Sequence, residues 1–175
     1  PYMRAREGVA KILWQLERHQ EAIDHYRDML RLNPGDNQGV RYSLLNLLTT
    51  LNRDAEALAL LEQHPDDGMA EWSYTHALLA FRTAGPSAKA AKILRQAQKI
   101  NSHVPAYLTG RKRVPNRMPS YMTWGGDDEA AIYANGYLPV WRRTPGAVAW
   151  LQSQSQSSPA DRPESKSRRT RRRRG

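Results

Sequence analysis

The five histidines are the side chains of this sequence with the most versatile chemistry, because imidazole can bind a metal ion or move a proton at neutral pH. A metal-binding helix would place two of them four residues apart, with a carboxylate at a ligating interval. No such arrangement occurs among His19, His25, His64, His76 and His103. We expect His19 to lie in a turn and His64 at a helix end, and we predict no metal site.

The acidic segment Gly125-Gly126-Asp127-Asp128 is the next candidate for chemistry, because carboxylates after glycines can form a cation loop. Its spacing lacks the alternating oxygen ligands of an EF-hand, so a turn followed by a helix start explains it better. Nucleophile elbows, Walker loops and dinucleotide fingerprints are also missing from the sequence. The sequence therefore predicts a protein that is not an enzyme and needs no cofactor.

Arginines at the C-terminus could neutralise phosphate groups. The segment from Ser153 onward holds eight basic and two acidic residues, or +6 of the formal charge of +10. The remaining +4 is distributed over about 150 residues, which is ordinary for a folded domain. Two hypotheses remain open for the tail: a solubilising end, or non-specific contact with nucleic acid or an acidic partner. The residues concerned are Arg168, Arg169, Arg171, Arg172, Arg173 and Arg174.

An internal repeat organises the rest of the chain. Segment 16–22, LERHQEA, returns thirty-five residues later as LNRDAEA at 51–57, and a third copy has Gly85 at its turn. Each copy reads as a helix end, a tight turn and a new helix. A period of 33 to 35 residues is typical of stacked helical hairpins of the tetratricopeptide type.

Small and large apolar residues each occur at the positions where such hairpins require them. Ala22, Ala57 and Ala90 stand where the second helix of each hairpin crosses the first most closely. Large apolar residues at helical spacing are expected to fill the seam. They are Val9, Leu13 and Leu16, then Leu44, Leu45, Leu48 and Leu51, then Tyr74, Leu78 and Phe81.

Composition agrees with an all-α fold, because Ala and Leu are strong helix formers. Cysteine is missing, which excludes disulfide frameworks and fits a reducing, cytoplasmic setting. No apolar stretch is long enough to span a membrane. The first residue is proline, which suggests a fragment of a longer chain.

Four segments follow from this pattern. We predict three tetratricopeptide-like hairpins at 1–102, a basic proline-containing connector at 103–126, a helical C-terminal element at 127–152 and a disordered arginine-rich tail at 153–175. Pro139 should kink or end the first helix of the C-terminal element, and Gly136 should weaken it further. Thr144 and Pro145 should start its last helix.

Several motifs outside the generic repeat also point to a family. They are PYMRAREG at 1–8, LNPGDNQGVRY at 32–42, HVPAYL at 103–108, GDDEA at 126–130 and TPGA at 144–147. Together they resemble bacterial tetratricopeptide proteins related to the suppression-of-tumorigenicity protein family, over about residues 1 to 151. The resemblance implies an all-helical repeat fold, further helices upstream and no catalytic residues to carry over.

Stacked hairpins expose a concave face lined by their first helices, which commonly binds an extended or helical peptide. An alternative is that Trp14, Tyr42 and Trp72 pack against upstream helices or the C-terminal element. The repeat register predicts a groove lined by Glu7, Lys11, Trp14, Tyr42, Asn46, Thr49, Trp72, Thr75 and Arg82.

The primary functional hypothesis is thus a non-catalytic scaffold that binds a protein or peptide partner in this groove. The alternative is an RNA- or ribosome-associated accessory protein that uses the arginine-rich tail for electrostatic affinity. The sequence leaves the oligomeric state and the identity of the partner open.

Overall fold

The computed structural model describes residues 2–156, and every regular element within that range is an α-helix. The predicted all-α array of helical hairpins with a short helical C-terminal element is therefore confirmed. The helices are α1 (Tyr2–Gln15), α2 (His19–Leu32), α3 (Val40–Thr50), α4 (Asp54–Glu62), α5 (Ala70–Ala84), α6 (Ala88–Ile100), α7 (Val104–Leu108), α8 (Asp127–Arg143) and α9 (Ala147–Gln156).

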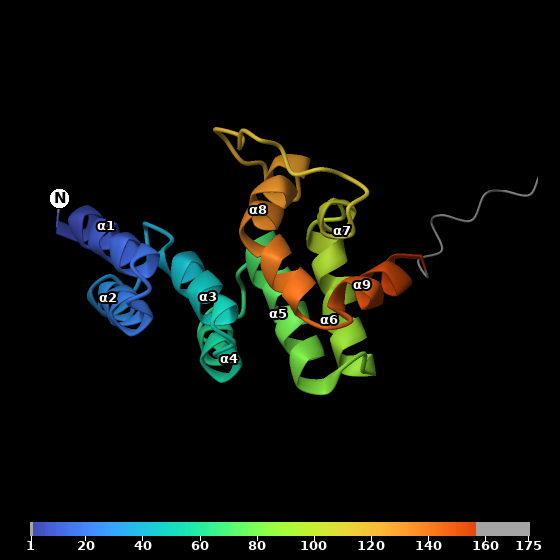
Figure 1. The fold of residues 1–175 in the computed structure, drawn as a ribbon, viewed down its shortest axis with the longest axis horizontal. Coiled ribbons are helices and arrows are strands. Elements are labelled where there is room, and N and C mark those ends of the chain that lie inside the picture. Colours follow the sequence, from blue (N-terminus) through green and yellow to red (C-terminus); the bar gives the residue numbers. More distant parts are fainter. Residues whose placement is uncertain (1, 157–175) are drawn as a thin grey trace, which may run out of the picture.

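The first six helices form three hairpins that follow one another from left to right in Figure 1. Two of the hairpin turns are built identically. Glu17 and Asn52 both adopt positive φ angles, 58° and 57°, and the next residue donates a backbone hydrogen bond across the turn in each case. Gly85 occupies the third turn with φ 60° and ψ −155°, a combination that essentially only glycine adopts.

The alanines predicted at the helix crossings are fully buried: Ala22, Ala57 and Ala90 each have no exposed surface. Most of the predicted seam is buried as well, from Leu13 through Leu44, Leu45 and Leu48 to Tyr74 and Leu78. Two assignments are wrong, because Val9 is 45% exposed and Leu16 is 62% exposed. They lie on a face of α1, shared with Ile12, that no described residue covers.

The C-terminal helices pack against the third hairpin. In Figure 1, α8 crosses in front of α5, and α7 and α9 lie at the right-hand end beside α6. Buried residues form two clusters. One joins α1 to α4, with Trp72 and Leu79 of α5, and the other joins α5 to α9.

Helix α8 continues through Pro139 to Arg143, so of the two predicted effects of this proline, a kink or a helix end, the helix end does not occur. Packing on α3, α5, α7 and α9 supports the helix around the missing amide donor. Gly136 has a packing role: a Cβ there would lie 3.2 Å from Nδ2 of Asn46, so glycine permits the close approach of α8 to α3. Helix α9 begins at Ala147, slightly later than Thr144 and Pro145 suggested.

Candidate partner-binding surface

Helix α8 occupies the concave face of the second and third hairpins. Nδ2 of Asn46 in α3 donates to the Gly136 carbonyl at 3.3 Å, and Nη2 of Arg143 donates to the Thr50 carbonyl at 3.4 Å. At the far end Nε of Arg82 in α5 donates to Oγ1 of Thr144 at 3.0 Å. The first helices α3 and α5 are therefore covered by a segment of the same chain.

The predicted groove residues divide into two groups. Thr49 and Thr75 have no exposed surface and Trp72 is 4% exposed. Arg82 is held by Thr144, by the Thr49 carbonyl at 3.1 Å and by Asp54 at 2.9 Å. Because these four side chains are buried or engaged within the fold, they are not available to line an open groove.

The other predicted residues lie on surface that α8 leaves open. Lys11 is exposed and pairs with Glu7 on the same helix, and Trp14 lies partly exposed beside them on α1. Tyr42 of α3 is also partly exposed. Asn46 is the exception, because its Nδ2 is bound to the Gly136 carbonyl of α8. The open part of the concave face thus belongs to α1 and α3.

Tyr42 and Trp72 pack against each other with ring centroids 5.6 Å apart in an edge-to-face arrangement. The Arg41 guanidinium lies over the Tyr42 ring, 4.5 Å from its centroid. The Tyr42 hydroxyl donates to Asp67 at 2.8 Å. Burial, followed by this carboxylate, raises the pKa of Tyr42, so the phenol stays neutral.

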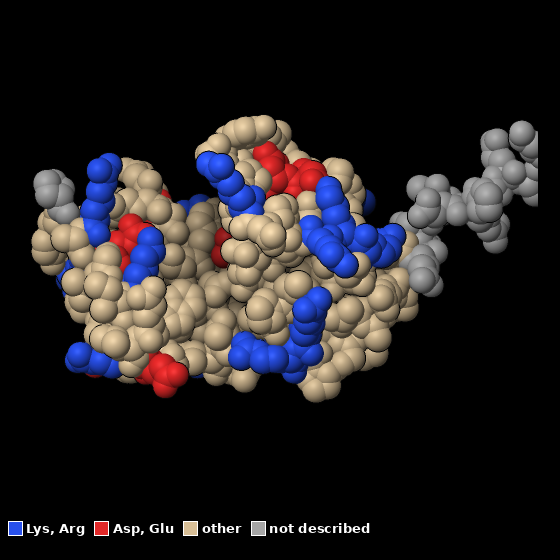
Figure 2. All heavy atoms as spheres, turned by 45° about the horizontal axis from the view of Figure 1, so that its top comes forward, with Lys and Arg blue, Asp and Glu red and all other residues tan. Residues whose placement is uncertain are grey.

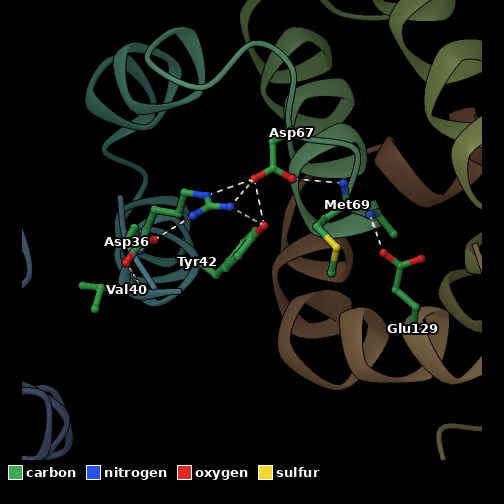
Figure 3. A network of polar contacts seen from close by, with 8 residues as sticks. Asp36, Val40, Tyr42, Asp67, Met69 and Glu129 are labelled. Atoms are coloured by element: carbon green, nitrogen blue, oxygen red, sulfur yellow. Dashed lines mark hydrogen bonds and ion pairs between the residues drawn. The ribbon is translucent and has the colours of Figure 1, made fainter. Parts of the chain in front are cut away.

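A polar network fixes the relative position of α3, α5 and α8 (Figure 3). Asp36 accepts hydrogen bonds from the Val40 and Arg41 amides at the start of α3, which satisfies helix-terminal donors. Arg41 bridges Asp36 and Asp67, both at 2.9 Å. Asp67 also accepts from the Met69 amide at 3.0 Å, directly before α5.

Glu129 of α8 completes this network from the other side. Its carboxylate, in a residue 3% exposed, accepts from the Ala70 amide at 2.8 Å, from Nδ2 of Asn101 at 2.9 Å and from the Gly125 amide at 2.8 Å. One buried carboxylate therefore joins the starts of α5 and α8 to the end of α6.

Sequence reasoning missed these buried carboxylates. Asp36 lies outside the N-cap position, which Gly39 occupies, but a carboxylate shortly before a helix start is a signal that could have identified it. Glu129 gave no comparable signal, because its partners Ala70 and Asn101 are far away in the sequence.

Among residues 2–156, no three histidine, aspartate or glutamate side chains form a group that could hold a metal ion. No helix in that range is long and apolar enough to cross a membrane. The predicted contact residues Arg168 to Arg174 lie outside the described part of the chain.

Comparison with known proteins agrees with this architecture. Residues 13–80 match the family model described as a tetratricopeptide repeat. The suppressor of tumorigenicity 7 protein-like proteins of Bos taurus and Mus musculus are each 29% identical over 170 residues, covering 86% of this chain and 30% of the relative. The Homo sapiens protein is also 29% identical, with 29% of its length covered.

The chain thus contains a tetratricopeptide repeat domain and is weakly similar to these mammalian proteins, of which it spans less than a third. No solved structure matches the chain significantly.

Proposed function

We propose that this chain is a non-catalytic scaffold that holds an extended or helical segment of a partner protein on the surface formed by α1 and the open part of α3. The observation that carries the proposal is the division of the concave face. Helix α8 covers α3 and α5, whereas Lys11, Trp14 and Tyr42 remain at the surface.

The chemistry of this surface suits a peptide. Aromatic rings provide contact area at low entropic cost, and the Glu7–Lys11 pair can exchange hydrogen bonds with a peptide backbone or side chains. Tetratricopeptide repeats generally mediate protein–protein contacts through such concave faces.

Site-specific photocrosslinking tests the proposal. A photoreactive amino acid replaces Lys11 in one version of the chain and Arg31, on the outer helix α2, in a second version. Both positions are exposed, so the substitutions test location and not folding. We expect a discrete crosslinked protein from source-cell lysate only through position 11, and we expect it to persist after nuclease treatment.

A variant pair sharpens this test with the identified partner. Lys11→Glu together with Trp14→Ala should weaken binding about tenfold or more, as expected for an anchoring aromatic residue and its neighbour. Arg31→Glu is the matched control and should have little effect. Equal crosslinking through both positions, or loss of the crosslink with nuclease, would contradict the assignment of this surface.

Two finer predictions accompany the proposal. A cytoplasmic setting is supported by the lack of cysteine in the sequence. The relatives reported above are mammalian, so the bacterial origin predicted from the sequence stays a prediction.

A further inference from the structure

The positive charge of the folded region is concentrated in one part of the chain. Residues 1–71 contain 12 acidic and 8 basic residues, whereas residues 72–126 contain 9 basic residues and no acidic residue. The prediction that charge outside the tail is evenly distributed is therefore wrong. Figure 2 shows the consequence: several groups of blue side chains stand over the half formed by α5 to α9.

The cations of the two regions also differ in their partners. Within the first two hairpins, Arg6, Lys11, Arg18, Arg27, Arg31, Arg41 and Arg53 all form ion pairs. In residues 72–126 only Arg82 and Lys112 pair with a carboxylate of the described chain. Seven exposed cations remain without a described acidic partner, and we name them the basic surface: Lys89, Lys92, Arg95, Lys99, Arg111, Arg113 and Arg117.

Helix α6 presents four of these cations on one side. Lys89, Lys92, Arg95 and Lys99 follow one another at intervals of three and four residues, which places them along one face. The opposite face, with Ala90, Leu94 and Ala97, is buried in the core. The cations therefore form a row about 15 Å long, since a helix rises 1.5 Å per residue.

The segment between α7 and α8 carries three further cations and two exposed aromatic rings. Arg111, Arg113 and Arg117 belong to it, and Tyr121 and Trp124 are 76% and 78% exposed. The end of the segment returns to the end of α6. Nδ2 of Asn101 donates to the Gly126 carbonyl at 2.8 Å, and a Cβ on Gly125 would lie 3.0 Å from the Ile100 carbonyl. The end of the segment therefore lies at the C-terminal end of α6, and Trp124 borders a pocket that also includes Asp66, Asp67 and Met69 before α5.

We infer that the basic surface, together with Tyr121 and Trp124, binds single-stranded nucleic acid. A row of unpaired cations neutralises successive phosphates and releases counterions. Exposed aromatic rings beside it stack on bases, which are accessible in a single strand and covered in a duplex.

The same features argue against an anionic membrane as the ligand. A helix that binds a membrane surface turns its apolar face toward the lipid. The apolar face of α6 is committed to the protein core, and its exposed side carries the four cations and Gln96, with Ala88 as the one exposed apolar residue of this helix. Helix α6 can therefore meet phosphate groups but cannot insert between lipid chains.

The inference concerns the folded region and is independent of the scaffold proposal. The arginine-rich tail supplies its own electrostatic affinity, so the test uses the whole chain and, in parallel, a version with Gln in place of the tail arginines 168, 169 and 171–174.

Fluorescence anisotropy with short labelled oligouridine and oligodeoxythymidine measures binding in both backgrounds. Lys89→Gln, Lys92→Gln, Arg95→Gln and Lys99→Gln are combined in one variant. We expect its affinity to fall by about tenfold or more, and the salt dependence of log K to weaken by about 2 to 3. Comparison of the two oligonucleotides identifies whether RNA or DNA is preferred.

The matched control removes four cations from the first two hairpins: Arg4→Gln, Arg18→Gln, Arg27→Gln and Arg31→Gln. The net charge changes equally in the two variants. Equal losses of oligonucleotide affinity would therefore overturn the inference and identify the exposed face of α6 as an ordinary solvated surface. Circular dichroism confirms that both variants keep their helices.

A second variant tests the aromatic rings. Tyr121→Ala with Trp124→Ala should weaken oligouridine binding about fivefold or more and leave heparin, which has no bases, unaffected. An unchanged affinity for oligouridine would overturn the assignment to single strands. Binding to anionic phospholipid vesicles that competes with the oligonucleotide and depends on the same rings would overturn nucleic acid as the ligand.

Discussion

The first two hairpins and the C-terminal helices are built from the same kind of element but are stabilised differently. The cluster from α1 to α4 is largely Leu and Ala. The cluster from α5 to α9 is rich in aromatic rings, including stacked Phe81 and Trp150 at 4.7 Å and stacked Tyr133 and Tyr137 at 4.7 Å.

Electrostatics follow the same division. Acidic and basic side chains pair across and along the first four helices, whereas most cations of α6 and the segment after α7 have no described acidic partner. The comparison shows that the repeat register determines where the helices lie. The charged residues of each repeat determine whether its surface cations are paired within the chain or remain unpaired.

The largest expected difference between the regions concerns tryptophan. Trp141 of α8 is fully buried and its Nε1 donates to the Tyr133 hydroxyl at 2.9 Å. Trp141→Ala should lower the free energy of unfolding by about 3–5 kcal/mol through lost contacts and a cavity. Trp14→Ala, at a partly exposed position of α1, should cost about 1 kcal/mol or less.

Denaturant unfolding followed by circular dichroism measures both variants. Similar losses for the two tryptophans would break the comparison, because they would show that the first hairpin depends on its aromatic residue as much as the C-terminal cluster does.

The second prediction concerns pH. Burial, together with the nearby carboxylates of Asp67 and Glu129, raises the pKa of Glu71 from its ordinary value of 4.5 to about 7. Between pH 4.5 and about 7, Glu71 is therefore protonated in the folded chain and ionised in the unfolded chain. Stability should fall by about 3 kcal/mol from this group as pH rises from 4.5 to above 7.

Glu71→Gln should remove that part of the pH dependence and stabilise the protein at pH 8. Glu21→Gln, at an exposed position of α2, is the control and should leave the stability profile between pH 5 and 8 unchanged. Urea unfolding at several pH values measures the effect. A Glu71→Gln profile parallel to that of the parent protein would show that the carboxyl stays ionised in the fold.

The smallest expected effect tests the paired and unpaired cations. Glu56 accepts hydrogen bonds from Arg53 and pairs with Arg27 of the neighbouring hairpin. Glu56→Gln should cost about 0.5–1 kcal/mol at low salt and less at high salt. Arg95→Gln, which removes an unpaired cation, should change stability by less than about 0.3 kcal/mol.

Thermal unfolding at two salt concentrations distinguishes the cases. A cost for Arg95→Gln equal to that for Glu56→Gln would mean that α6 relies on its cations for stability, and the proposed ligand surface would lose its main support.

Sequence periodicity was sufficient to predict the hairpins because their contacts are local. Ala22, Ala57 and Ala90 repeat with the turns, and a close helix crossing requires small residues wherever it occurs. The shared positive φ of Glu17 and Asn52 could also have been inferred from their alignment with Gly85 at the third turn.

The position of α8 could not be predicted in the same way, because its contacts join residues about 90 positions apart. Asn46 and Gly136 lie in close contact, and neither residue type by itself predicts that contact. The groove prediction therefore retained Thr49, Thr75 and Arg82, since the repeat register contains no information about a helix outside the repeats. Charge segregation was present in the sequence but was hidden by averaging over 150 residues.

Helix α8 has a consequence for any competitor at the surface it covers. Because it is tethered to the face on which it lies, its effective concentration there is on the order of millimolar, as for short intramolecular connections. A partner segment that binds α5 as tightly as α8 does would displace α8 only at a free concentration above that value. A segment that binds more tightly would need a proportionally lower concentration. At ordinary cellular concentrations α8 should therefore stay on the third hairpin, which leaves α1 and the open part of α3 for the proposed partner.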